Sequence, residues 1–203
     1  VYEPSEGTVT LDGHLLNGKV PYKIAALGLG RTFQNIRLFK DLSVLDNVLI
    51  AFGNHHKAHV LASFFRLPAY YKNEEELKDK ALELLKIFDL DKEAETLAKN
   101  LAYGQQRRLE IVRALATEPK ILFLDEPAAG MNPQETAELT ALIRRIKNEF
   151  NITIMLIEHD MSLVMEVTER IYVLEYGRMI AHGTPDEIKN DKRVIEAYLG
   201  GEA

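Results

Sequence analysis

One short apolar run limits most strongly what this chain can fold into. Residues 121–124 are all large and apolar, and two carboxylates, Asp125 and Glu126, follow them directly. A run this short, with no polar residue alternating in it, is typical of a strand that is buried on both faces of a parallel sheet. Because parallel strands are joined by crossover connections that are usually helical, the sequence predicts an α/β fold.

The residues after this run alternate between helix and strand patterns. The predicted order is a helix over 134–150, a strand over 152–157, a helix over 162–167 and a strand over 170–175. This alternation predicts that further parallel strands join the strand at 121–124. A hairpin turn at 176–178, a strand over 179–182 and a helical tail are expected next.

The first half of the chain predicts a hairpin and several helices. Residues 8–16 alternate around Asp12 and Gly13, a pair that supplies the positive φ angles of a tight turn. A short helical run follows Pro21, and residues 28–30 then form a glycine-rich break. Helices are expected over 39–52, 73–89 and 102–117, the last two from their amphipathic spacing.

Composition excludes several classes of function. The 203 residues carry a formal net charge of −6, which argues against a protein that binds nucleic acid by neutralising phosphates. There is no cysteine, so disulfides, thiolate catalysis and cysteine-ligated metal centres are excluded. No apolar run approaches the roughly 20 residues that a membrane-spanning helix needs, so any membrane role is expected to be peripheral.

The two carboxylates after the apolar run have a direct chemical use. Asp125 could hold Mg²⁺, in part through water, and Glu126 could orient an attacking water molecule. The pair by itself is equally compatible with a helix cap or a solvated turn. The residues around it must therefore decide between catalysis and structure.

A second block, Leu101-Ala102-Tyr103-Gly104-Gln105, lies before the apolar run, with Gln105 standing 20 positions ahead of Asp125. In this order and spacing the chain resembles the ATP-binding cassette (ABC) family, with its signature helix and Walker B strand. The resemblance implies a P-loop NTPase-like parallel sheet core, an antiparallel β subdomain and a helical signature subdomain. It also implies ATP and Mg²⁺ as cofactors.

Three further positions match this family in the expected order. Gln34, after Arg31-Thr32-Phe33, is similar to the Q-loop glutamine, which senses nucleotide, reaches the metal and links the site to a membrane subunit. Asn132 falls in the D-loop, and His159 matches the switch histidine that senses the γ-phosphate. Taken singly, Gln34 reads as a surface residue and His159 as a structural hydrogen-bonding residue. The joint order favours the family roles.

The resemblance assigns the signature block to nucleotide held by an opposite subunit. Ala102, Tyr103, Gly104 and Gln105 would face that nucleotide, with Gly104 letting the backbone approach the γ-phosphate at a helix N-terminus. Gly104 could equally be a simple turn. Ala102 stands where the family usually has serine, so the hydroxyl that would reach the phosphate is missing, whereas Tyr103 is shared with branched-chain amino acid importers.

The resemblance narrows to those importers through several stretches of sequence. These are residues 31–35, 54–56, 103–108, 127–133 and 177–185. It implies one ABC ATPase domain over 1–203, with a helical signature subdomain at 40–117, a Walker B to switch core at 118–176 and an importer-type tail at 177–203. The implied partners are a second ATPase subunit, placed head to tail, and transmembrane permease subunits. A periplasmic or extracellular solute-binding protein is implied as an indirect partner, and no nucleic acid partner is implied. The chain itself would lie at the cytoplasmic face of the cell membrane as a peripheral subunit.

An ATPase of this kind also needs a phosphate loop of the form G-x-x-x-x-G-K-[ST]. Residues 13–20 have the glycines and the lysine, but Val20 cannot bind Mg²⁺ and the segment falls in a hairpin pattern. We expect the loop to lie upstream of residue 1, and this chain alone to be poorly stable and unable to hydrolyse ATP in its own half-site. Removal of the strand beside the loop should also expose apolar surface on its neighbours.

Two other functions remain open from the sequence. The chain could be a noncatalytic interaction or regulatory module, which Ala102 favours and Glu126 with His159 disfavours. It could also be a soluble cassette for DNA repair or translation, but such proteins carry large insertions or tandem cassettes that this sequence lacks. His55, His56 and His59 are expected to lie in a solvated loop and not to bind metal.

Overall fold

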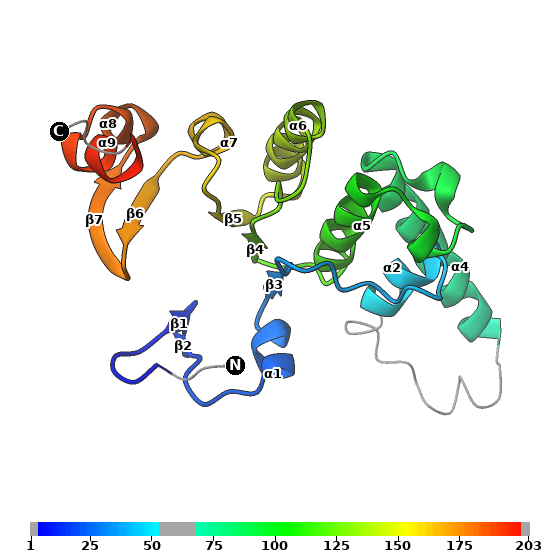
Figure 1. The fold of residues 1–203 in the computed structure, drawn as a ribbon. Helices are drawn as coiled ribbons and strands as arrows, with labels where there is room; N and C mark the ends of the chain where they lie inside the picture. The colour runs from blue at the N-terminus through cyan, green and yellow to red at the C-terminus, as the bar shows by residue number, and fades with distance from the viewer. Residues whose placement is uncertain (1–3, 53–67, 200–203) are drawn as a thin grey trace.

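The computed structural model describes residues 4–52 and 68–199 and has the α/β fold that the sequence predicts (Figure 1). A parallel sheet stands at the centre, with a helical group beside it on one side and two β hairpins on the other (Figure 1). His55, His56 and His59, which were predicted to lie in a solvated loop, fall outside the described residues.

The central sheet has three parallel strands in the order β3-β4-β5. They are β3 (Leu29–Arg31), β4 (Ile121–Asp125) and β5 (Thr153–Ile157). The apolar run therefore forms the middle strand, as predicted, with Leu122 opposite Ile154 on β5 and opposite Gly30 on β3. Leu122 is fully buried, whereas Phe123 on the other face is only half-buried. The prediction of burial on both faces was thus wrong for one face.

Strand β3 was not predicted, because its glycines indicate a break. Gly30 is needed there for close packing: a Cβ at this position would lie 3.1 Å from the Cβ of Pro119 and 3.3 Å from the carbonyl oxygen of Ala114. A glycine inside a strand often marks such a close approach of backbones. The strand also leads directly into Thr32, whose N–H donates to the Phe123 carbonyl and extends the pairing by one residue.

The helical group consists of α2 (Val44–Phe52), α4 (Pro68–Ile87) and α5 (Tyr103–Leu115). Helix α2 starts later than predicted, where the Ser43 Oγ accepts from the Asp46 N–H at 3.0 Å in the manner of an N-cap. Between α4 and α5 lie two short 3₁₀ turns, η1 (Asp91–Glu93) and η2 (Ala98–Asn100). Leu85 of α4 and Leu109 of α5 are fully buried in the core that continues to β4.

Two helices flank β5 along the chain. Helix α6 (Pro133–Phe150) precedes the strand and α7 (Met161–Val167) follows it, close to the predicted bounds. Leu139 of α6 and Leu163 of α7 are buried in the main core. These helices place the loops that follow β4 and β5 next to each other at the carboxyl end of the sheet.

The remaining strands form two antiparallel hairpins. Strands β1 (Thr10–Leu11) and β2 (His14–Leu15) pair around Asp12 and Gly13, which both have positive φ as predicted. Strands β6 (Ile171–Glu175) and β7 (Arg178–Gly183) pair across a turn that also has two positive φ angles. Among the described residues β6 pairs with β7 and not with the parallel sheet, so the prediction that the strand over 170–175 joins the parallel sheet was wrong.

Three short helices complete the described elements. They are α1 (Pro21–Ala26), α8 (Pro185–Lys189) and α9 (Lys192–Leu199). The near match to a phosphate loop at 13–20 lies across the exposed β1–β2 hairpin and ends where α1 starts, so it differs from a loop that follows a buried strand. Within residues 4–52 and 68–199, no helix combines the length and apolar character that crossing a membrane requires.

Candidate active site

The carboxyl end of β4 carries Asp125, the predicted metal ligand, and Glu126, the predicted catalytic carboxylate. Asp125 is the last residue of the strand, and Glu126 follows with a φ of 44°, in the left-handed region that non-glycine residues rarely adopt. The Glu126 N–H donates to the Ile157 carbonyl of β5 at 2.9 Å, which fixes this unusual backbone conformation. A strained residue held by its surroundings at the end of a strand is a common feature of functional sites.

Both carboxylates receive a partner from the segment that follows β3. The Gln34 Nε2 donates to the Glu126 Oε2 at 2.7 Å, and the Arg31 Nη2 donates to the Asp125 Oδ2 at 2.8 Å. Since β3 and β4 are parallel neighbours, their carboxyl ends meet at one edge of the sheet. The structure therefore brings Gln34, Asp125 and Glu126 together at this edge of the sheet.

The oxygen donors at this edge are of the kind that Mg²⁺ prefers. The Gln34 amide donates through its nitrogen, which leaves its Oε1 as a possible ligand, and Asp125 keeps a second carboxylate oxygen beyond the one that accepts from Arg31. No cluster of three or more histidine, aspartate or glutamate side chains able to hold a metal occurs in the part of the chain that the structure describes. The set fits Mg²⁺ as a partial shell that water and phosphate oxygens would complete.

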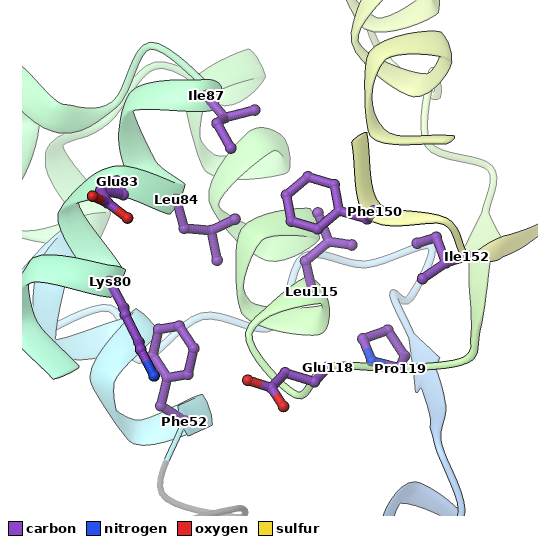
Figure 2. A pocket seen from close by; sticks show the side chains of 10 residues that line it. All are labelled: Phe52, Lys80, Glu83, Leu84, Ile87, Leu115, Glu118, Pro119, Phe150 and Ile152. Carbon is purple, nitrogen blue, oxygen red and sulfur yellow. The ribbon is translucent and has the colours of Figure 1, made fainter. Parts of the chain in front are cut away.

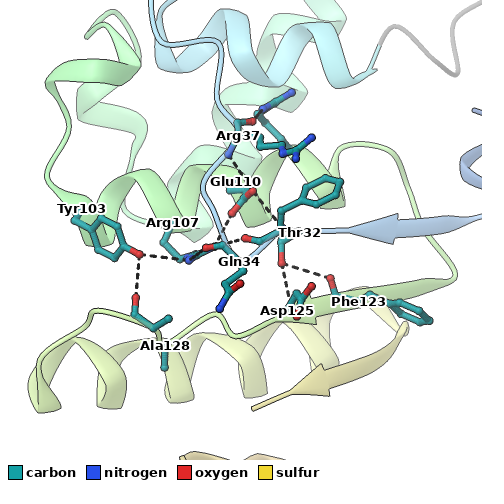
Figure 3. Close-up of polar contacts among 12 residues, drawn as sticks. Thr32, Gln34, Arg37, Tyr103, Arg107, Glu110, Phe123, Asp125 and Ala128 are labelled. Atoms are coloured by element: carbon teal, nitrogen blue, oxygen red, sulfur yellow. Dashed lines mark hydrogen bonds and ion pairs between the residues drawn. The ribbon is translucent and has the colours of Figure 1, made fainter. Parts of the chain in front are cut away.

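The loop that carries Gln34 is attached to helix α5 by two buried charges (Figure 3). Arg107 donates to the Phe33 and Gln34 carbonyl oxygens at 2.7 and 2.8 Å, and Glu110 accepts from the Phe33 and Arg37 N–H groups at 3.3 and 3.2 Å. The two side chains also form an ion pair of 2.9 Å. Sequence reasoning did not single out either residue, because charged residues at helical spacing usually mark an exposed face.

The signature block starts helix α5 without a side-chain cap. Ala102 occupies the N-cap position and has no side-chain acceptor, while the Gln105 Oε1 accepts from the Ala102 N–H at 3.1 Å. Gly104 is buried, and a Cβ added to it would lie 3.2 Å from the Glu135 Oε1. The absence of a side chain at Gly104 therefore lets the start of α5 pack closely against Glu135 of α6.

Tyr103 links the signature block to the D-loop. Its hydroxyl donates to the Ala129 carbonyl at 2.9 Å, and the Arg107 Nη2 lies 3.4 Å from the same hydroxyl (Figure 3). The D-loop ends at Asn132, whose Oδ1 accepts from the Gln134 and Glu135 N–H groups as the N-cap of α6. Asn132 thus has a structural role in addition to the predicted nucleotide contact.

The end of β5 contributes a histidine and a carboxylate with very different surroundings. The His159 side chain is 73% exposed, and its Nδ1 lies 3.9 Å from Glu158, whose own side chain is 2% exposed. Glu158 accepts from the Ala128 N–H at 2.9 Å and from the His159 N–H at 3.0 Å. This buried carboxylate, which sequence reasoning missed, ties the loop after Glu126 to the end of β5.

A separate cavity of about 420 Å³ lies between the helical group and the amino ends of the strands. It has an apolar floor that includes Phe52, Leu84 and Phe150, and Lys80, Glu83 and Glu118 line it as well (Figure 2). None of the site residues described above lines it. The cavity is therefore distinct from the carboxylate site.

Comparison with known families agrees with this geometry. Residues 1–129 match the model of the family described as ABC transporter, and residues 178–203 match that of the branched-chain amino acid ATP-binding cassette transporter. The chain belongs to the ABC transporter family. It is an ABC-type ATPase, and ATPases of this family couple nucleotide hydrolysis to transport.

Several relatives are similar over nearly the whole chain. The high-affinity branched-chain amino acid transport ATP-binding protein BraF of Pseudomonas aeruginosa is 47% identical over 199 residues, which cover 98% of this chain and 78% of the relative. LivG of Escherichia coli K12, which has the same description, is 46% identical with the same coverage. A probable LivG of Archaeoglobus fulgidus is 34% identical and is covered to 77%.

Solved structures of ATP-binding cassettes have the same fold. A nucleotide-free cassette from an ABC transporter superimposes with a TM-score of 0.77 at 31% identity, covering 98% of this chain and 79% of the other. The ADP conformation of the cassette MJ1267 gives a TM-score of 0.78 at 30% identity with the same coverage. These matches confirm the predicted ABC ATPase fold.

Proposed function

We propose that this protein is the ATP-hydrolysing subunit that energises import of branched-chain amino acids or closely related solutes. The observation that carries the proposal is the 2.7 Å hydrogen bond between Gln34 and Glu126 at the carboxyl end of β4. It places a carboxylate that can polarise water next to a residue on the loop that would sense the membrane partner. The solute class is supported by the BraF and LivG relatives and by the tail match at 178–203.

In this proposal each site residue has one role. Asp125 holds Mg²⁺ with Gln34, Glu126 orients the attacking water and His159 senses the γ-phosphate. Mg²⁺ bound there would neutralise charge that develops on the phosphates. Ala102, Tyr103, Gly104, Gln105 and Asn132 would contact nucleotide across a head-to-tail dimer of cassettes.

The proposed membrane partner is a pair of permease subunits that contact the loop after β3. Phe33 and Phe39 are both more than one third exposed there, and arginine side chains lie over their rings. Exposed aromatic and arginine side chains are typical of the centre of protein interfaces. The place of action would then be the cytoplasmic face of the cell membrane, with the solute-binding protein acting indirectly.

Transport by the reconstituted complex tests the proposal. We expect ATP-dependent uptake of labelled leucine into proteoliposomes that contain the full-length protein, its permease and its binding protein. Glu126→Gln should abolish uptake and reduce ATP turnover by at least about 100-fold, because it removes the general base and keeps the volume. Uptake that continues with Glu126→Gln would contradict the proposal.

A noncatalytic role in trans is the second candidate, and Ala102 favours it. This residue offers no hydroxyl to a phosphate, at a position where the family usually has serine. Under this alternative, residues 1–203 alone would not turn over ATP and would act by completing a partner's site. Glu126→Gln in the mixed dimer is the discriminating variant: a loss of turnover favours the motor, whereas unchanged turnover favours the noncatalytic role.

A further inference from the structure

Two charged side chains of α5 hold the segment over 33–37, and they do so by binding its backbone groups. Arg107 donates to two carbonyl oxygens of the segment, and Glu110 accepts from two of its N–H groups. Four backbone groups of one short loop are therefore satisfied by a single pair of side chains from α5. Such a loop cannot shift relative to α5 without breaking charge-assisted hydrogen bonds.

Stability alone does not account for this pair. Arg107 is fully buried and Glu110 is 5% exposed. Burial of an ion pair costs so much desolvation that apolar residues of the same volume are often equally or more stabilising. Apolar side chains could pack α5 against the loop, but they could not fix the positions of its carbonyl and N–H groups.

The held segment carries two functional surfaces. On one, the Gln34 amide donates to Glu126 at 2.7 Å. On the other, Phe33 is 37% exposed, and the Arg31 and Arg37 guanidinium groups lie 5.2 and 4.5 Å from the centre of its ring. A partner that presses on Phe33 would therefore act on the same backbone that positions Gln34.

Tyr103 extends the same network to the other side of the carboxylate. Its hydroxyl lies within 3.4 Å of Arg107 and donates to the Ala129 carbonyl at 2.9 Å. Ala129 is three residues beyond Glu126, and its own N–H donates to the Glu126 carbonyl at 3.2 Å. The network thus reaches Glu126 both through Gln34 and through the D-loop.

We propose that Arg107 and Glu110 are positioning residues that hold Gln34 against Glu126, and that the Tyr103 hydroxyl couples them to the D-loop. A displacement of the exposed Phe33 surface is thereby transmitted to both sides of the catalytic carboxylate. The kinetic part of this inference rests on the proposed function, whereas the attachment of residues 33–37 to α5 does not.

Amide hydrogen exchange of the full-length protein without nucleotide tests the attachment. The variants are Arg107→Lys, which keeps the charge and loses the forked geometry, and Glu110→Gln, which keeps the shape and loses the charge. We expect exchange of residues 33–37 to become at least about 10-fold faster in both, as for the loss of one or two hydrogen bonds to a charged group. The matched control is Arg108→Lys, since Arg108 forms a surface pair with Glu138 at 3.1 Å and should leave this exchange unchanged.

The positioning role is tested by ATP turnover of the same variants in the complex with the permease. We expect kcat to fall about 10-fold or more in Arg107→Lys and Glu110→Gln, and about 3- to 10-fold in Tyr103→Phe, with KM for ATP within about 2-fold of the original value. Thermal unfolding of each variant identifies any that fails to fold. Tyr103→Phe removes one hydroxyl only and keeps the test available if both charge variants unfold.

Each result separates the two proposals. Unchanged exchange over 33–37 in folded Arg107→Lys or Glu110→Gln overturns the attachment, whatever the turnover. If the wild-type complex hydrolyses ATP, faster exchange over 33–37 in the variants with unchanged kcat overturns the positioning role. A wild-type complex without turnover refutes the proposed function and leaves the attachment to be decided by the exchange data.

Discussion

Removal of the buried carboxylate at the end of β5 should destabilise the loop after Glu126. The Glu158 side chain is 2% exposed and accepts from the N–H groups of Ala128, His159 and Asp160 at 2.9, 3.0 and 3.4 Å. Glu158→Ala leaves these donors without their acceptor and creates a small void. Because the carboxylate joins two loops that carry site residues, the change should affect stability and activity together.

The expected loss of stability follows from the surroundings of the donors. Ala128 and Asp160 are half-buried, whereas His159 is exposed, so water can replace the lost acceptor most easily at His159. Each of the two less accessible donors costs about 1–2 kcal/mol when it is left unpaired. We therefore expect the free energy of unfolding to fall by about 3 kcal/mol, which lowers Tm by roughly 6–12 °C for a domain of this size.

Urea unfolding of the full-length protein measures this loss as a lower midpoint with an unchanged slope. The matched control is Glu169→Ala, because the Glu169 side chain is 81% exposed and its ion pair with Lys147 is on the surface. That variant should change the free energy of unfolding by less than about 0.5 kcal/mol. A loss below about 1 kcal/mol for Glu158→Ala would show that its three hydrogen bonds do not hold the loop.

Three further changes have expected outcomes. Asn132→Ala should cost about 1 kcal/mol in urea unfolding, since it removes the side-chain cap of α6, and Asn132→Ser should restore most of it. Gly30→Ala should cost about 1–3 kcal/mol by the same assay, because the new methyl group would crowd Pro119; an unchanged midpoint would disprove the close packing of β3. The hydrogen bonds from Thr184 hold the pKa of Glu187 below its ordinary value of 4.5. The cap therefore stabilises α8 above pH 4.5, and this stabilisation is lost as the pH falls through the lowered pKa. Circular dichroism of Glu187→Gln should lack this acid-dependent loss of helix.

The elements that the sequence predicted best are those with local signals. The hairpin at Asp12 and Gly13 and the helix spacing over 102–117 each depend on residues that are close in sequence. Strand β3 was missed because Gly28 before it and Gly30 within it indicate a break, although Gly30 is required by a neighbour that is 89 positions away along the chain, Pro119. Contacts of this kind leave no periodic pattern in the sequence.

Some residues of the candidate site could be identified from the sequence, and others could not. Asp125 and Glu126 were identified because they end an apolar strand, and Gln34 because it resembles a known motif at the right place. The residues that position them, Arg107 and Glu158, were not identified. Both are charged residues that bind backbone groups of a distant loop, Arg107 at Phe33 and Glu158 at Ala128, and no residue type in those loops signals the contact. Only the folded arrangement shows them as buried.

Strand β5 shows why residue type and observed burial can differ. Its apolar run predicts burial, yet Met155 and Ile157 are about half exposed, and on the neighbouring hairpin Tyr172 and Leu174 are exposed by more than half. Burial depends on the elements that cover a strand and not on the strand alone. Among the described residues β5 pairs only with β4, so one of its edges keeps unpaired backbone groups beside these apolar side chains. Exposed apolar strand edges of this kind favour further strand pairing or association.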